Sequence, residues 1–89
     1  MEKEVQQPHE LRLDNRARLS VTGVKDVESF DENVVVLRTV RGLLVIRGDK
    51  LQLQALSLDG GQIAVNGLID SLSYEEEQKT AGFFRRLFR

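Results

Sequence analysis

Glycine-containing turn sequences divide the second half of this chain at short intervals. They are Arg41-Gly42, Arg47-Gly48-Asp49, Asp59-Gly60-Gly61 and Asn66-Gly67. Glycine supplies the positive φ that tight turns need, and Asn or Asp before it tolerates the same backbone region. Between these sequences, apolar and polar residues alternate with the period of a β-strand. The pattern therefore predicts an all-β fold with a corner of the chain at each glycine, although Asn66-Gly67 also suits a bulge within a strand.

The alternating segments predict seven or eight short, mainly antiparallel strands. They lie at Leu11 to Leu13, Leu19 to Val21, Val24 to Phe30 with a bulge, Val34 to Val40, Leu43 to Ile46, Leu51 to Leu58, Ile63 to Val65 and Leu68 to Tyr74. The two nearly continuous apolar segments before and after Arg41-Gly42 are typical of central strands covered on both faces, so we expect them to form the core hairpin. The leucines of residues 51–58 would also suit a helix, but their strict alternation favours a strand. A spacing of about ten residues fits a sandwich, a roll or a short stack of rungs.

The length of 89 residues fits one small domain with two flanking segments. Residues 1–8 are charged, rich in Gln and end in the only Pro, which predicts a flexible, disordered lead. We expect the β domain to cover residues 9–76. Residues 77–89 then form a linker and a basic aromatic tail.

Charge is distributed unevenly along the chain. Residues 9–77 contain eight Lys or Arg and twelve Asp or Glu, whereas residues 78–89 contain four basic residues and no acidic one. An acidic body repels phosphate backbones, which argues against a nucleic-acid partner. The absence of Cys excludes disulfides and thiolate chemistry. Because there is also no apolar run of about 18 residues, we expect a cytoplasmic protein without a membrane span.

The residues that usually carry catalysis or bind metals are absent or scattered. The single His, His9, lies beside the flexible lead, and we interpret it as a solvated residue without a role. The carboxylates of Asp26, Glu28, Asp31 and Glu32 match no calcium loop and predict a solvated strand face. We therefore expect no enzymatic activity, no catalytic residue, no cofactor and no metal site.

One short segment is similar to a signature of another family of small β proteins. Leu44-Val45-Ile46-Arg47-Gly48, followed by Leu51, resembles the second signature of Sm-like RNA-binding proteins. The rest of the pattern differs, because about forty residues follow the motif and the opening helix of that family is missing. A module that binds single-stranded nucleic acid is kept as the alternative function.

The C-terminal tail has an amphipathic pattern. On a helical wheel, Phe83, Phe84, Leu87 and Phe88 fall within about 140° of arc, and Arg85, Arg86 and Arg89 lie on the opposite side. So short a helix is marginal in water, so we expect the tail to become ordered only on docking. It docks either on an anionic membrane or a partner, or on its own domain, and the sequence leaves both open.

An ordered set of strand and turn residues resembles the YabP family of sporulation proteins. It runs through Leu13, Asn15, Leu19, Val21, Gly23-Val24, Phe30, Thr39, Gly42, Val45-Ile46, Gly48, Leu51, Leu56, Ile63, Val65, Gly67, Ile69, Leu72 and Tyr74. The resemblance covers nearly the whole predicted β domain. The tail, with Gly82-Phe83-Phe84 and Leu87-Phe88, is more similar to the YabP branch than to its YqfC sister branch.

This resemblance implies a non-enzymatic protein made in the mother cell and needed for assembly of the spore coat. Beyond the resemblance, we hypothesise that edge strands or a face of the acidic β domain bind other sporulation or coat-assembly proteins, or further copies of the chain. The basic aromatic tail would hold the protein at an anionic membrane, at the outer forespore membrane or the developing coat. The resemblance carries over no catalytic residues. The turn glycines Gly23, Gly42, Gly48, Gly60 and Gly67 are then structural, and Phe83 to Arg89 are the candidate docking residues.

Overall fold

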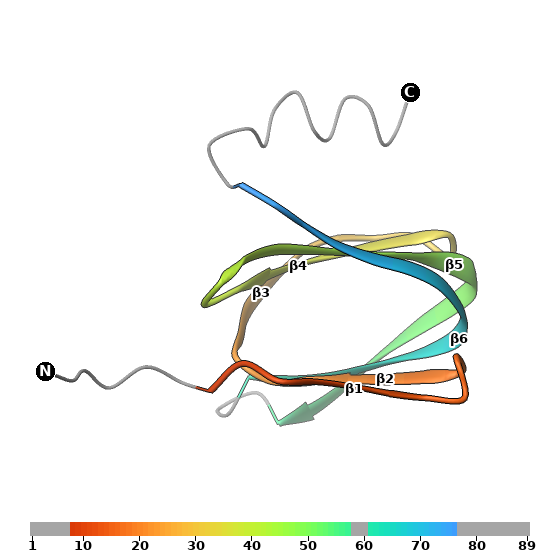
Figure 1. Ribbon diagram of the computed structural model, residues 1–89, viewed down its shortest axis with the longest axis horizontal. Helices are drawn as coiled ribbons and strands as arrows, with labels where there is room; N and C mark the ends of the chain where they lie inside the picture. Colours follow the sequence, from red (N-terminus) through yellow and green to blue (C-terminus); the bar gives the residue numbers. More distant parts are fainter. Residues whose placement is uncertain (1–7, 58–60, 77–89) are drawn as a thin grey trace, which may run out of the picture.

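The computed structural model describes residues 8–57 and 61–76, and these form an all-β fold, as predicted (Figure 1). The strands are β1 (Leu11–Asp14), β2 (Arg18–Val21), β3 (Val24–Phe30), β4 (Val34–Thr39), β5 (Gly42–Ser57) and β6 (Gln62–Glu75). They form one antiparallel sheet in the order β1-β2-β6-β5-β4-β3. Among the described residues, no helix is long and apolar enough to cross a membrane.

The long strands β5 and β6 belong to two layers of the folded sheet. The first half of β5 pairs with β4 and with the end of β6, from Leu43 opposite Glu75 to Arg47 opposite Ser71. The second half of β5 pairs with the start of β6, which also pairs with β2. Figure 1 shows these layers one above the other, with β5 and β6 curving from one to the other. The sheet is therefore a roll, one of the architectures that the strand spacing allows.

The curve lies where two glycines interrupt the pairing of β5 with β6. The register shifts between Arg47 and Gly48 and again between Asp49 and Gln52. Gly67 lies on the opposite strand with a φ of 129°, which side chains other than that of Gly rarely adopt. The two glycines lie at bulges within continuous strands, with Asp70 as the extra residue near Gly48 and an extra residue of β5 opposite Gly67, so the predicted corner at Arg47-Gly48-Asp49 is absent. For the same reason the described residues form six strands where the sequence predicts seven or eight.

The core hairpin is formed as predicted, by β4 and β5. Thr39 pairs with Gly42 across the turn at Val40-Arg41, and the Thr39 hydroxyl donates to the Gly42 carbonyl at 2.7 Å. Side chains of the hairpin are buried on both faces. Between the layers lies the main core, formed by Leu19, Val21, Val24, Val35, Leu37, Leu44, Ile46, Leu51, Ile63, Val65 and Ile69. A second cluster, Val34, Val36, Leu43 and Val45, lies on the other face of the hairpin.

Candidate interaction surfaces

The first and last strands of the sheet order, β1 and β3, each have one edge without a partner strand in the described part of the chain. All four residues of β1 are exposed. Leu11 and Leu13 pair with Val21 and Leu19, which belong to the core, so both leucines extend the core face beyond the closed part of the roll. They are 36% and 41% exposed. An open backbone edge beside exposed leucines can accept a further strand from another chain.

His9 connects the start of β1 to the opposite layer. Its Nδ1 lies 2.8 Å from the carbonyl oxygen of Thr22, and its Nε2 lies 2.6 Å from the hydroxyl of Tyr74. Because a carbonyl only accepts, Nδ1 carries the proton, and in neutral His9 the hydroxyl donates to Nε2. The two rings meet edge to face, with centroids 5.8 Å apart. The interpretation of His9 as a solvated residue is therefore wrong.

The opposite edge of the sheet, β3, has an ion-pair cluster centred on Arg38. Its guanidinium lies 2.6 Å from a carboxylate oxygen of Glu28 and 3.7 Å from one of Asp26. The side chain of Glu28 is only 22% exposed, so this carboxylate is paired and half-buried, whereas the sequence predicts a solvated one. Asp31 and Glu32 are exposed. In the described segments, no three His, Cys, Asp or Glu side chains are grouped as a metal site would require.

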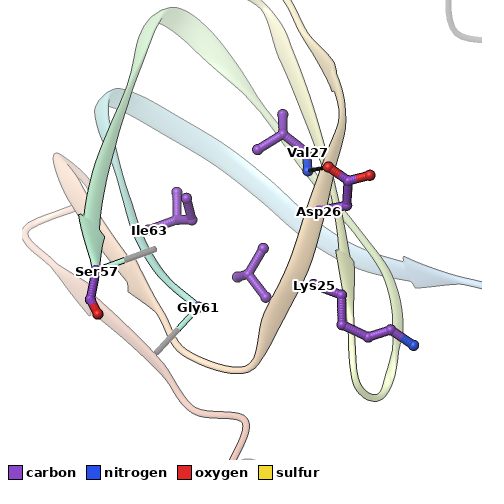
Figure 2. A pocket seen from close by; sticks show the side chains of 7 residues that line it. Lys25, Asp26, Val27, Ser57, Gly61 and Ile63 are labelled. Carbon is purple, nitrogen blue, oxygen red and sulfur yellow. Dashed lines mark hydrogen bonds between the residues drawn. The ribbon is translucent and has the colours of Figure 1, made fainter. Parts of the chain in front are cut away.

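A small cleft lies between the start of β3 and the β5–β6 hairpin (Figure 2). Its volume is about 160 Å³, and it is lined by Val24, Lys25, Asp26, Val27, Ser57, Gly61 and Ile63. Figure 2 shows that Ile63 and Val27 point into the space between the strands, whereas Lys25 points away from it. The backbone amide of Val24 donates to the Gly61 carbonyl at 3.0 Å across its floor. Binding sites for small molecules usually have about 300 to 1,000 Å³, so this cleft does not favour a small-molecule ligand.

The structure places the predicted site residues at different points of the fold. Gly23 joins β2 to β3, Gly42 begins β5, and Gly48 and Gly67 lie at the bulges. Gly60 lies outside the described residues, as do all of the candidate docking residues from Phe83 to Arg89. Arg47 of the Sm-like motif is exposed in β5, while Leu44 and Ile46 of the same motif are in the core.

Sequence reasoning missed the contact between His9 and Tyr74 and the ion pair between Arg38 and Glu28. Both depend on how distant strands approach each other. A signal was available only for the second, because Glu28 and Arg38 lie in two adjacent predicted strands that a short turn joins.

Two comparisons relate this chain to known proteins over most of its length. The model of the YabP family matches residues 5–81. Spore protein YabP from Bacillus subtilis (strain 168) is 39% identical over 88 residues, which is 96% of this chain and 88% of that protein. The family model covers all six strands of the roll and ends at residue 81.

Proposed function

The chain belongs to the YabP family, and from this premise we propose that it is a non-enzymatic interaction module that takes part in assembly of the spore coat. The observation that carries the proposal is the 39% identity to a spore protein over nearly the full length of both chains. A match of this extent relates the two proteins as wholes. The role in coat assembly comes from the family resemblance.

The shape of the described surface supports binding to proteins. The exposed apolar residues Leu11 and Leu13 lie on β1, whose outer edge has no partner strand among the described residues. Peptide strands bind such edges through backbone hydrogen bonds, while flanking side chains provide specificity. We propose that β1 accepts a strand from another sporulation protein or from a second copy of this chain.

The C-terminal tail supplies the second part of the proposal. Its aromatic residues and arginines suit an anionic membrane or a membrane-bound partner, since each Arg near anionic lipid contributes about 1 kcal/mol. The β domain would then recruit coat proteins while the tail holds it at the outer forespore membrane, on the mother-cell side.

Imaging of fluorescent fusions in sporulating cells of the native host tests both parts. We compare the intact chain, a chain truncated after Thr80, and Leu13→Lys, in which a charge at the open edge disfavours strand addition. Ser71→Ala, an exposed change on β6, is the matched control. We expect the intact chain and the control to surround the forespore, the truncated chain to become diffuse, and Leu13→Lys to reach the forespore without recruiting coat proteins. A diffuse intact chain, or unchanged coat recruitment by Leu13→Lys, would contradict the proposal.

A further inference from the structure

The β4–β5 hairpin has an apolar face that points away from the main core. Val34 and Val36 of β4 and Leu43 and Val45 of β5 alternate along their strands with residues of the core such as Val35 and Leu44, so their side chains point to the opposite side of the sheet. We refer to these four residues as the outer face.

The outer face is buried in the full chain of 89 residues. Val36 and Val45 expose none of their surface, Leu43 exposes 1%, and Val34 exposes 9%. Their register partners on the adjacent strands are small, because Ser29 pairs with Val36 and Ser73 pairs with Val45. Arg38, the partner of Leu43, turns its guanidinium toward Glu28 on β3. Among the described residues, β3 and β6 flank the hairpin and the other layer of the sheet lies on its inner side, so no described strand is stacked on the outer face. The flanking strands alone therefore do not cover it.

We propose that the C-terminal segment, residues 77–89, folds back and covers the outer face. β6 ends at Glu75, which pairs with Leu43, so the chain leaves the sheet at the border of this face. The described residues that border the other two segments lie away from this face. Ser57 and Gln62, on either side of the β5–β6 connection, pair in the other layer, and His9, near the start of the described chain, contacts Tyr74. Tyr74 pairs with Leu44 of the core, so it lies on the inner side of the sheet.

The segment has the size and the chemistry that the outer face requires. A helix over the last seven residues would be about 10 Å long and about 10 Å wide, which is enough for two adjacent strands about 5 Å apart. Phe83, Phe84, Leu87 and Phe88 supply its apolar side. Each aromatic ring can bury about 150 to 250 Å². Residues 76–82, at up to about 3.3 Å each, reach the face with length to spare.

This inference extends the proposed function without depending on it. The same aromatic side chains cannot contact the outer face and an external surface at once. Docking of the tail on a membrane would therefore require it to leave the outer face. If the chain never binds a membrane, the tail still covers this face.

Single cysteines test the proposal directly, because the natural chain has no Cys. We measure the reaction of Val45→Cys with a thiol reagent in the intact chain and in the chain truncated after Thr80. Reaction of a buried thiol requires local opening, so we expect truncation to accelerate the reaction at Val45→Cys at least about tenfold. Leu44→Cys, in the main core, reports folding and should stay protected in both chains. Ser73→Cys, exposed on the adjacent strand, should react rapidly in both.

A second variant keeps the chain at full length, in case truncation unfolds the domain and Leu44→Cys also becomes reactive. Phe84→Ser should accelerate the reaction at Val45→Cys, whereas Arg85→Ser, on the polar side of the tail, should leave it slow. Protection of Val45→Cys that persists without the tail overturns the proposal. Protection that depends on protein concentration overturns it as well, since a second copy would then be the cover.

Discussion

The imidazole of His9 and the hydroxyl of Tyr74 lie 2.6 Å apart, although 65 positions of sequence separate them. His9 also contacts the carbonyl of Thr22 at the end of the β2 segment, at 2.8 Å. The half-buried ring of His9, two residues before β1, thus contacts both layers of the roll. β1 is an edge strand that pairs on one side only, so this contact contributes to holding it in place.

We predict that Tyr74→Phe lowers the free energy of unfolding by about 0.5 to 1.5 kcal/mol, since it removes one hydrogen bond and keeps the ring. Urea unfolding of Tyr74→Phe, His9→Ala and the double variant measures the coupling. The double variant should be more stable than the sum of the single changes implies, because both remove the same bond. Full additivity would show that the contact contributes nothing.

The class of fold was predictable because it is encoded locally. Alternation of Leu19 with Ser20 and Val21 marks a strand without reference to any other part of the chain. The hairpin at Arg41-Gly42 was predictable for the same reason. Gly48 was not, because its role depends on Leu68 of the opposite strand. Glycine suits both a corner and a bulge, and only the pairing of β5 with β6 distinguishes them.

The candidate site was less predictable than the fold. The sequence shows that Leu43 and Val45 are apolar, but which face of the hairpin they occupy follows from the register with β4. His9 appears in the sequence as a lone polar residue, and its partner is a tyrosine at the other end of the domain. The tail pattern predicts docking, but it does not identify the surface on which the tail docks.

Gly48 allows the two strands to approach each other at the bend. A Cβ at this position would lie 1.9 Å from the carbonyl oxygen of Leu68, which is backbone and cannot rotate away. We predict that Gly48→Ala costs at least about 2 kcal/mol, as overpacking of a rigid contact does. Thermal unfolding measured by circular dichroism checks the effect, with Ser71→Ala as an exposed control. A variant as stable as this control would contradict the assigned cause of the bend.

The two carboxylates near Arg38 should contribute unequally to stability. Glu28 lies 2.6 Å from the guanidinium with a side chain 22% exposed, whereas Asp26 lies 3.7 Å away and is 64% exposed. Because solvent screens the exposed pair, we predict that Glu28→Gln costs about 1 kcal/mol and Asp26→Asn nearly nothing. Urea unfolding at low and high salt measures both changes, and the Glu28→Gln deficit should shrink as salt rises. If Glu28→Gln and Asp26→Asn lower the free energy of unfolding equally, distance from Arg38 and exposure do not determine the contribution of each carboxylate.

If the outer face and a membrane compete for the tail, a change that weakens the contact between the tail and the outer face should strengthen membrane binding. Val45→Thr places a hydroxyl under the proposed position of the tail and weakens the contact between them. If the contact loses about 1 kcal/mol, the fraction of chains with a free tail rises about fivefold while that fraction is small. We therefore expect Val45→Thr to bind vesicles of phosphatidylcholine and phosphatidylglycerol more tightly than the unmodified chain.

The vesicle experiment separates the two parts of this prediction. Ser73→Ala, exposed on the same side of the sheet, should bind like the unmodified chain, and truncation after Thr80 should abolish binding. Binding should also weaken as salt rises, since the arginines of the tail act through charge. If Val45→Thr binds no more tightly while truncation still abolishes binding, the tail docks on the membrane without competition from the outer face. If no variant binds vesicles, the aromatic residues of the tail act within the chain or on a protein partner, and the thiol measurements on Val45→Cys decide between these two.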